Sequence, residues 1–97
     1  MTNEEIWNIG LEERTDELSK LQSEYDRLDV ECRKAEFEMD MYARLREVNN
    51  AMLYKQKFSE KYEKCARASE KLTKQKNALE NEISVLKKEI YYINSLM

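Results

Sequence analysis

Apolar side chains recur along this chain in alternating steps of three and four residues, with charged side chains between them. This spacing keeps the apolar positions on one face of an α-helix and is the heptad pattern of a coiled coil. The first run fills core positions a and d at Leu11, Leu18, Leu21, Tyr25, Leu28, Cys32, Ala35, Met39 and Tyr42, with Arg14 as a polar interruption. A helix over residues 11–42 is therefore expected, and its apolar stripe needs a second helix to cover it.

The second half of the chain repeats the pattern with larger aliphatic side chains. Its core positions are Phe58, Tyr62, Cys65, Ser69, Leu72, Lys76, Leu79, Ile83, Leu86, Ile90, Ile93 and Met97. Ile at a with Leu at d favours two parallel strands, and a Lys at a reaches water more easily in a dimer than in a larger assembly. Residues 76–90, KNALENEISVLKKEI, resemble the leucine zipper of basic-leucine-zipper proteins, and this resemblance implies a parallel dimer.

The two heptad frames do not match. Extended forward, the first frame puts an a position at Arg46, whereas the second frame, extended backward, puts one at Val48. Two residues at about 100° each amount to about half a turn, so the apolar stripe changes face between Met39 and Phe58.

Two arrangements accommodate this change of face. In one, an unbroken helix repacks locally; in the other, the chain turns at Asn49 and Asn50, giving a helical hairpin or a kinked helix in a bundle. Because the sequence contains one glycine, Gly10, and no proline, few positions favour a turn. We therefore expect an all-α fold, a long parallel two-stranded coiled coil with a phase break near residues 42–58, and keep the hairpin as the alternative.

This pattern divides the chain into four segments. Residues 1–10 form a cap segment, in which Thr2 and Glu5 match a capping box and Gly10 either ends a short helix or weakens a long one. Residues 11–42 and 59–97 are the two heptad segments, and residues 43–58 contain the phase break. Because the heptads reach the last residue, we expect the second segment to be part of a longer rod.

The segment around the phase break is rich in large apolar side chains that lie on more than one helix face. A band wider than a dimer seam can receive a third helix or a partner peptide, or it can fill the core where the frame changes. The candidate docking residues in this band, within residues 41–58, are Met41, Leu45, Val48, Met52, Leu53 and Tyr54.

Composition excludes most catalytic designs. The chain has no His, no glycine-rich phosphate loop and no cluster of metal ligands, so no enzyme activity, cofactor or metal is expected. Cys32 and Cys65 stand far apart, as reduced thiols of an intracellular, cytoplasmic protein would. No apolar run is long enough to insert into a membrane.

Charge is segregated along the chain. Residues 1–53 carry seven basic and fourteen acidic side chains, whereas residues 54–77 carry eight basic and three acidic ones. Such blocks favour electrostatic attraction between neighbouring rods, which salt weakens. Alternatively, they form the charged, solvated face of a long helix. Nucleic acid is disfavoured because the net charge is −3 and because the stretch before the zipper-like segment, residues 64–69, has one Arg and no Asn.

These features predict a protein that works by association. We expect an oligomerisation rod or scaffold segment of a larger protein of the cytoskeletal, centrosomal, kinetochore, motor-adaptor or tethering class, which pairs with itself or a homologous helix. The main alternative is a helical subunit of a hetero-oligomeric bundle, followed by a nucleic-acid-binding zipper.

Overall fold

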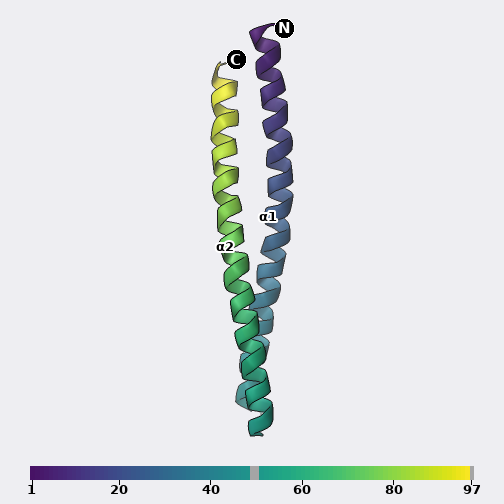
Figure 1. Cartoon of the computed structure of the whole chain (residues 1–97), viewed down its shortest axis with the longest axis vertical. Helices are drawn as coiled ribbons and strands as arrows, with labels where there is room; N and C mark the ends of the chain where they lie inside the picture. Colours follow the sequence, from purple (N-terminus) through teal and green to yellow (C-terminus); the bar gives the residue numbers. More distant parts are fainter. Residues whose placement is uncertain (49–50, 97) are drawn as a thin grey trace. The chain divides into compact units, whose positions relative to one another are not determined.

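The computed structural model describes residues 1–48 and 51–96, and these form two long helices (Figure 1). α1 spans Asn3–Val48 and α2 spans Met52–Leu96. No strand occurs among the described residues, so the predicted all-α class is confirmed. The expectation of one unbroken helix is wrong, because α1 ends at Val48 and a second helix begins at Met52. The turn predicted at Asn49 and Asn50, and the core position assigned to Met97, lie outside the described residues.

The first turn of α1 is capped as the sequence predicts. The Thr2 hydroxyl accepts a hydrogen bond from the Glu5 backbone N–H at 3.2 Å, which satisfies one of the free donors at the helix start. Gly10 does not end a short helix, because α1 continues through it without a left-handed backbone conformation. It is instead a point of low helix propensity within a long helix.

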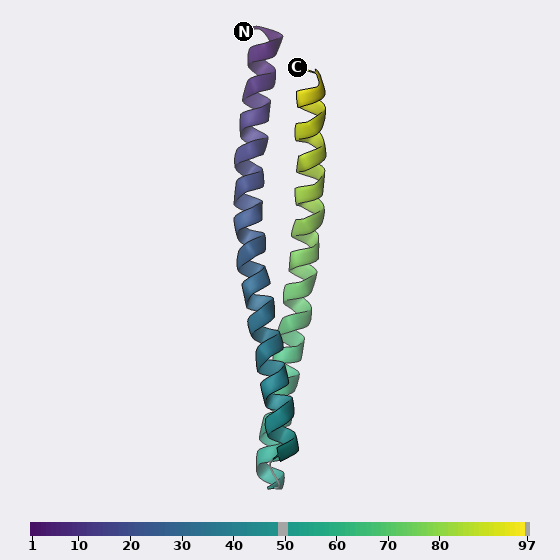
Figure 2. The same cartoon turned by 180° about the vertical axis from the view of Figure 1, so that it is seen from behind.

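Contacts divide the chain into two units, each a pair of antiparallel helix segments. The first unit, Met1–Arg27 with Asn77–Met97, joins the first part of α1 to the last part of α2. The second unit is Leu28–Lys76, which contains the end of α1 and the start of α2. Figures 1 and 2 show the first pair from opposite sides, with the purple start of α1 beside the yellow end of α2.

Antiparallel pairing explains why the two heptad frames differ. Each helix has its own stripe, so a half-turn offset between the frames requires no repacking inside a helix. The two helices run in opposite directions. The heptad frames therefore place each a position of one helix opposite a d position of the other. The cross-helix ion pairs follow this direction, with Arg14 against Glu89 in the first unit and Asp29 against Lys76 in the second. Each apolar stripe is covered by the other helix of the same chain.

The most deeply covered side chains all lie on these stripes. Among the described residues, five are buried: Leu28, Cys32 and Ala35 in the second unit, and Ile83 and Leu86 in the first. The other predicted core positions of both helices are half-buried where they are described.

Replacement of Leu28 by Ala should destabilise the fold strongly. Leu28 is 3% exposed, so the truncation leaves a cavity between the helices and should cost about 2–5 kcal/mol. Chemical denaturation followed by circular dichroism measures the loss. Val30→Ala is the matched control, because Val30 lies in the same helix and unit but is 63% exposed, and its effect should stay within about 0.5 kcal/mol. Equal losses for the two variants would contradict the packing described here.

Replacement of Gly10 by Ala should stabilise the first unit. A Cβ at this position would meet Nη1 of Arg14, the end of a flexible side chain, at an ordinary contact distance of 3.4 Å. The gain in helix propensity is about 0.5–1 kcal/mol, seen as a higher denaturation midpoint. A lower midpoint would show that the close approach of Arg14 to Gly10 matters more than propensity.

Candidate functional site

The predicted core residues of the first unit line the contact between its two helix segments. All of them are buried or half-buried: Leu11, Leu18, Leu21, Tyr25, Leu79, Ile83, Leu86, Ile90 and Ile93. The sequence predicted that a second chain covers these positions, whereas the structure places the other helix of the same chain against them. The zipper-like segment of α2 is therefore occupied by α1 in an antiparallel direction.

The predicted core residues of the second unit have the same arrangement. They are also buried or half-buried: Leu28, Cys32, Ala35, Met39, Tyr42, Phe58, Tyr62, Cys65, Leu72 and Lys76. The rings of Tyr42 and Phe58 stack across the two helices, with centroids 6.3 Å apart.

Two cations lie over aromatic rings of the opposite helix in this unit. The Arg46 guanidinium lies 5.3 Å from the centre of the Tyr62 ring, and the Lys61 ammonium lies 5.5 Å from that of Tyr42. Each contact contributes about 0.5–1 kcal/mol at such exposed sites. Sequence reasoning missed both cations because nothing in a heptad frame indicates which aromatic ring of another helix they will cover.

The polar core residue Lys76 is neutralised across the two helices. Its ammonium lies 2.5 Å from Oδ1 of Asp29, and the two side chains are 24% and 25% exposed. The other carboxylate oxygen of Asp29 accepts from Arg33 at 3.1 Å. The hydrogen bond from Lys76 holds the pKa of Asp29 below its ordinary value, against partial desolvation and together with the charge of Arg33. The sequence placed Lys76 at core position a and predicted that its ammonium reaches water, whereas the structure gives it a carboxylate partner.

The polar interruption in the first heptad run, Arg14, has a similar role in the first unit. Its Nε donates to Oε2 of Glu89 at 3.2 Å, and its Nη1 donates to the Gly10 carbonyl at 3.2 Å. Because both charged side chains remain partly exposed, the ion pair itself contributes little stability, about 0–1 kcal/mol. Its main effect is on register, since a shifted pairing would separate Arg14 from Glu89.

Neither cysteine has the surroundings of a catalytic nucleophile. Both thiols are free; Cys32 is buried and Cys65 is half-buried. Desolvation raises the pKa of Cys65, and its hydrogen bond to the Glu38 carboxylate, 3.5 Å long, raises that pKa further. A thiol held in its protonated form is a poor nucleophile.

Large apolar side chains are exposed where α1 ends and α2 begins. We name Val48, Met52, Leu53 and Tyr54 the connection cluster; their side chains are 76%, 83%, 75% and 52% exposed. The other two candidate docking residues, Met41 and Leu45, are half-buried on α1. The connection cluster packs against little in its own unit.

A second apolar surface lies between the helices of the first unit. This terminal groove, with a volume of about 410 Å³, is lined by Ile6, Trp7, Gly10, Arg14, Glu89, Tyr92, Ile93 and Leu96. Ile6, Tyr92 and Leu96 are exposed, and Trp7 is 37% exposed. No pattern in the sequence predicts that Trp7 and Ile6 line one groove with Tyr92.

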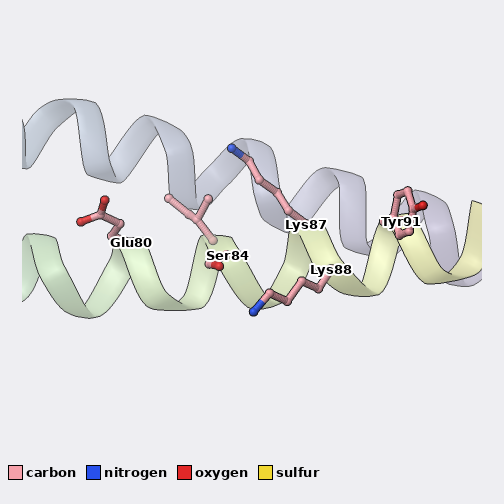
Figure 3. A pocket seen from close by; sticks show the side chains of 6 residues that line it. Glu80, Ser84, Lys87, Lys88 and Tyr91 are labelled. Carbon is pink, nitrogen blue, oxygen red and sulfur yellow. The ribbon is translucent and has the colours of Figure 1, made fainter.

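A more polar depression lies farther along the same unit (Figure 3). Its lining comes from α2, with Glu80, Ser84, Lys87, Lys88 and Tyr91 on successive turns. In Figure 3 the Lys87 side chain points toward α1, whereas Lys88 points away from it. Its Lys side chains are exposed and the depression is open to solvent, as on an ordinary charged helix surface.

Residues 1–48 and 51–96 contain no group of three or more His, Cys, Asp or Glu side chains placed to hold a metal ion. Within the same part of the chain, neither helix has a stretch that is long and apolar enough to cross a membrane. Comparison with protein families, with curated proteins and with solved structures gave no match.

The ion pair between Asp29 and Lys76 should make stability depend on pH. Because the pKa of Asp29 is lower in the folded chain than in the unfolded one, its contribution is present above about pH 4 and is lost as the pH falls through the folded value. We expect wild type to exceed Asp29→Asn in free energy of unfolding at neutral pH, with the difference shrinking in acid.

Denaturation of both proteins over a pH series measures this difference. Asp26→Asn is the control, because Asp26 is exposed and has no ion pair among the described residues, and we expect it to unfold like wild type at neutral pH. A difference between wild type and Asp29→Asn that stays constant into acid would show that the ion pair does not contribute.

Proposed function

We propose that this chain is an assembly module, a helical hairpin that associates with a second copy and so acts as the oligomerisation or scaffold segment of a larger protein. Pairing of α1 with α2 covers one stripe on each helix and leaves other apolar surfaces open. A second hairpin would cover them as in a four-helix bundle, in which each helix has two helical neighbours.

The observation that carries the proposal is the clustering of exposed large apolar side chains. Burial of apolar surface contributes about 25 cal/mol per Å², whereas association costs about 4–15 kcal/mol in lost translational and rotational freedom. Isolated exposed residues such as Val30 cannot offset that cost. The connection cluster and the terminal groove each bring several large side chains together, which is what a stable interface needs.

The cysteines favour a reducing compartment for this module. Cys32 and Cys65 are free thiols, and a protein of oxidising compartments would more often use them in disulfides. We therefore place the module in the cytoplasm, with its partner there as well.

Light scattering coupled to size-exclusion chromatography tests the proposal directly. At micromolar concentration we expect a mass of twice the 11.7 kDa of the single chain, with full helicity by circular dichroism. A fully helical chain that stays monomeric would contradict self-association and leave the alternative, in which the hairpin joins helices of another protein.

Loss of the connection cluster should weaken this association without unfolding the hairpin. For the double variant Leu53→Ala and Tyr54→Ala we expect the dimer dissociation constant to rise about tenfold or more, since truncation of central apolar interface residues costs more than about 1 kcal/mol each. Analytical ultracentrifugation measures the constant. The control is Val30→Ala with Phe37→Ala, two exposed apolar residues on the outer face of α1, for which we expect no change. An equal effect of both double variants would show that the connection cluster is not the docking surface.

A further inference from the structure

Basic side chains form a stripe on one face of α2 in the second unit. Lys57, Lys64, Arg67, Lys71 and Lys74 follow one another at steps of seven, three, four and three residues, which keeps them on a single helix face. All five are exposed. This basic stripe, residues 57–74, spans about 26 Å along the helix at 1.5 Å per residue.

The stripe is largely unused by its own chain. Lys74 pairs with Glu70 at 3.4 Å, whereas Lys57, Lys64, Arg67 and Lys71 take part in none of the ion pairs formed among the described residues. Several members are instead like-charged neighbours three or four residues apart, a spacing at which charges on a helix repel each other. Glu60, Glu63 and Glu70 lie at the same spacing and offset part of this repulsion, and the remaining positive charge is exposed to solvent.

The first unit carries a matching surface of the opposite sign. Glu12, Glu13, Asp16 and Glu17 are exposed on α1, and they form two like-charged pairs at a spacing of four residues. They too form no ion pair with the described residues. The helix dipole favours carboxylates only in the first turn, where Glu4 and Glu5 lie, and so does not account for this acidic patch of residues 12–17.

We propose that the basic stripe of one copy binds the acidic patch of a second copy. This inference rests on the proposed self-association. The apolar surfaces provide the free energy of association, and the charged surfaces determine how the two copies are oriented. Each surface is exposed, lies on a single helix and carries neighbouring charges of one sign. Contact between the two surfaces would therefore reduce the repulsion within each of them. Because the contact lies at the surface, salt should weaken it.

A nucleic acid fits the stripe less well than a second copy does. The whole chain has a net charge of −3, and its acidic patch would repel a phosphate backbone. The stripe contains one Arg, the side chain best suited to bidentate phosphate contacts, and four Lys.

Two charge-reversal variants, measured separately and then mixed, test whether the basic stripe binds the acidic patch. The stripe variant is Lys64→Glu with Lys71→Glu, and the patch variant is Glu12→Lys with Asp16→Lys. Each should self-associate about tenfold or more weakly than wild type, because two attractive contacts become repulsive. An equimolar mixture of the two variants should regain the wild-type dissociation constant, as should one chain carrying all four substitutions. Sedimentation at low and high salt measures these constants.

The matched control is Lys87→Glu with Lys88→Glu, which makes the same change in net charge outside the stripe and should self-associate like wild type. If wild type dimerises and the stripe variant does so equally well, the inference is wrong while the proposed function stands. If both variants dissociate but the mixture does not recover, the stripe does not bind the acidic patch. A monomeric wild type would overturn the proposed function and this inference together.

A duplex oligonucleotide tests the other class of partner. In fluorescence anisotropy we expect no binding to wild type at physiological salt. Binding that is lost in the stripe variant, with self-association unchanged, would assign the stripe to nucleic acid and overturn the inference.

Discussion

The pairing of two heptad stripes across α1 and α2 is the interaction on which the rest of the structure depends. A long charged helix is marginal in water by itself, since its apolar face stays exposed. When the helices lie antiparallel, a positions of one face d positions of the other, and Leu28, Cys32, Ile83 and Leu86 become buried. This burial fixes the register of each unit, and the register decides which polar groups meet.

Polar contacts then reinforce that register. Lys76 sits at a core position because Asp29 accepts its ammonium from the opposite helix, and Arg14 is tolerated in the first heptad run because Glu89 and a backbone carbonyl accept from it. Charges this close to a seam contribute less to stability than to specificity, since any other register would leave them unpaired. Apart from Lys74, the side chains of the basic stripe and the acidic patch form no ion pair among residues 1–48 and 51–96, and we propose that a second copy pairs with them.

The sequence predicts local features better than chain direction. Heptad spacing identified the helical segments and positions that are buried or half-buried, and the capping-box motif identified the cap at Thr2, because these features depend on spacing along one helix. The unbroken helix was a wrong prediction because the half-turn offset of the two frames belongs to two separate antiparallel helices, which accommodate it without strain, and a shortage of proline and glycine does not prevent a helix from ending. The contact of Lys76 with Asp29 and the terminal groove around Trp7 depend on which helix faces which, and the pattern alone does not decide this.

The most direct measurement is the distance between two spin labels in the first unit. Asp26 and Glu80 line the same groove between α1 and α2, so labels at Asp26→Cys and Glu80→Cys, with Cys32 and Cys65 replaced by Ala, report on pairing within one chain. Dilution with unlabelled protein removes distances between chains. Because paired helix axes lie about 8–10 Å apart, we expect a distance below about 30 Å that persists on dilution. A distance near 80 Å, as an unbroken helix of about 1.5 Å rise per residue requires, would contradict the antiparallel pairing.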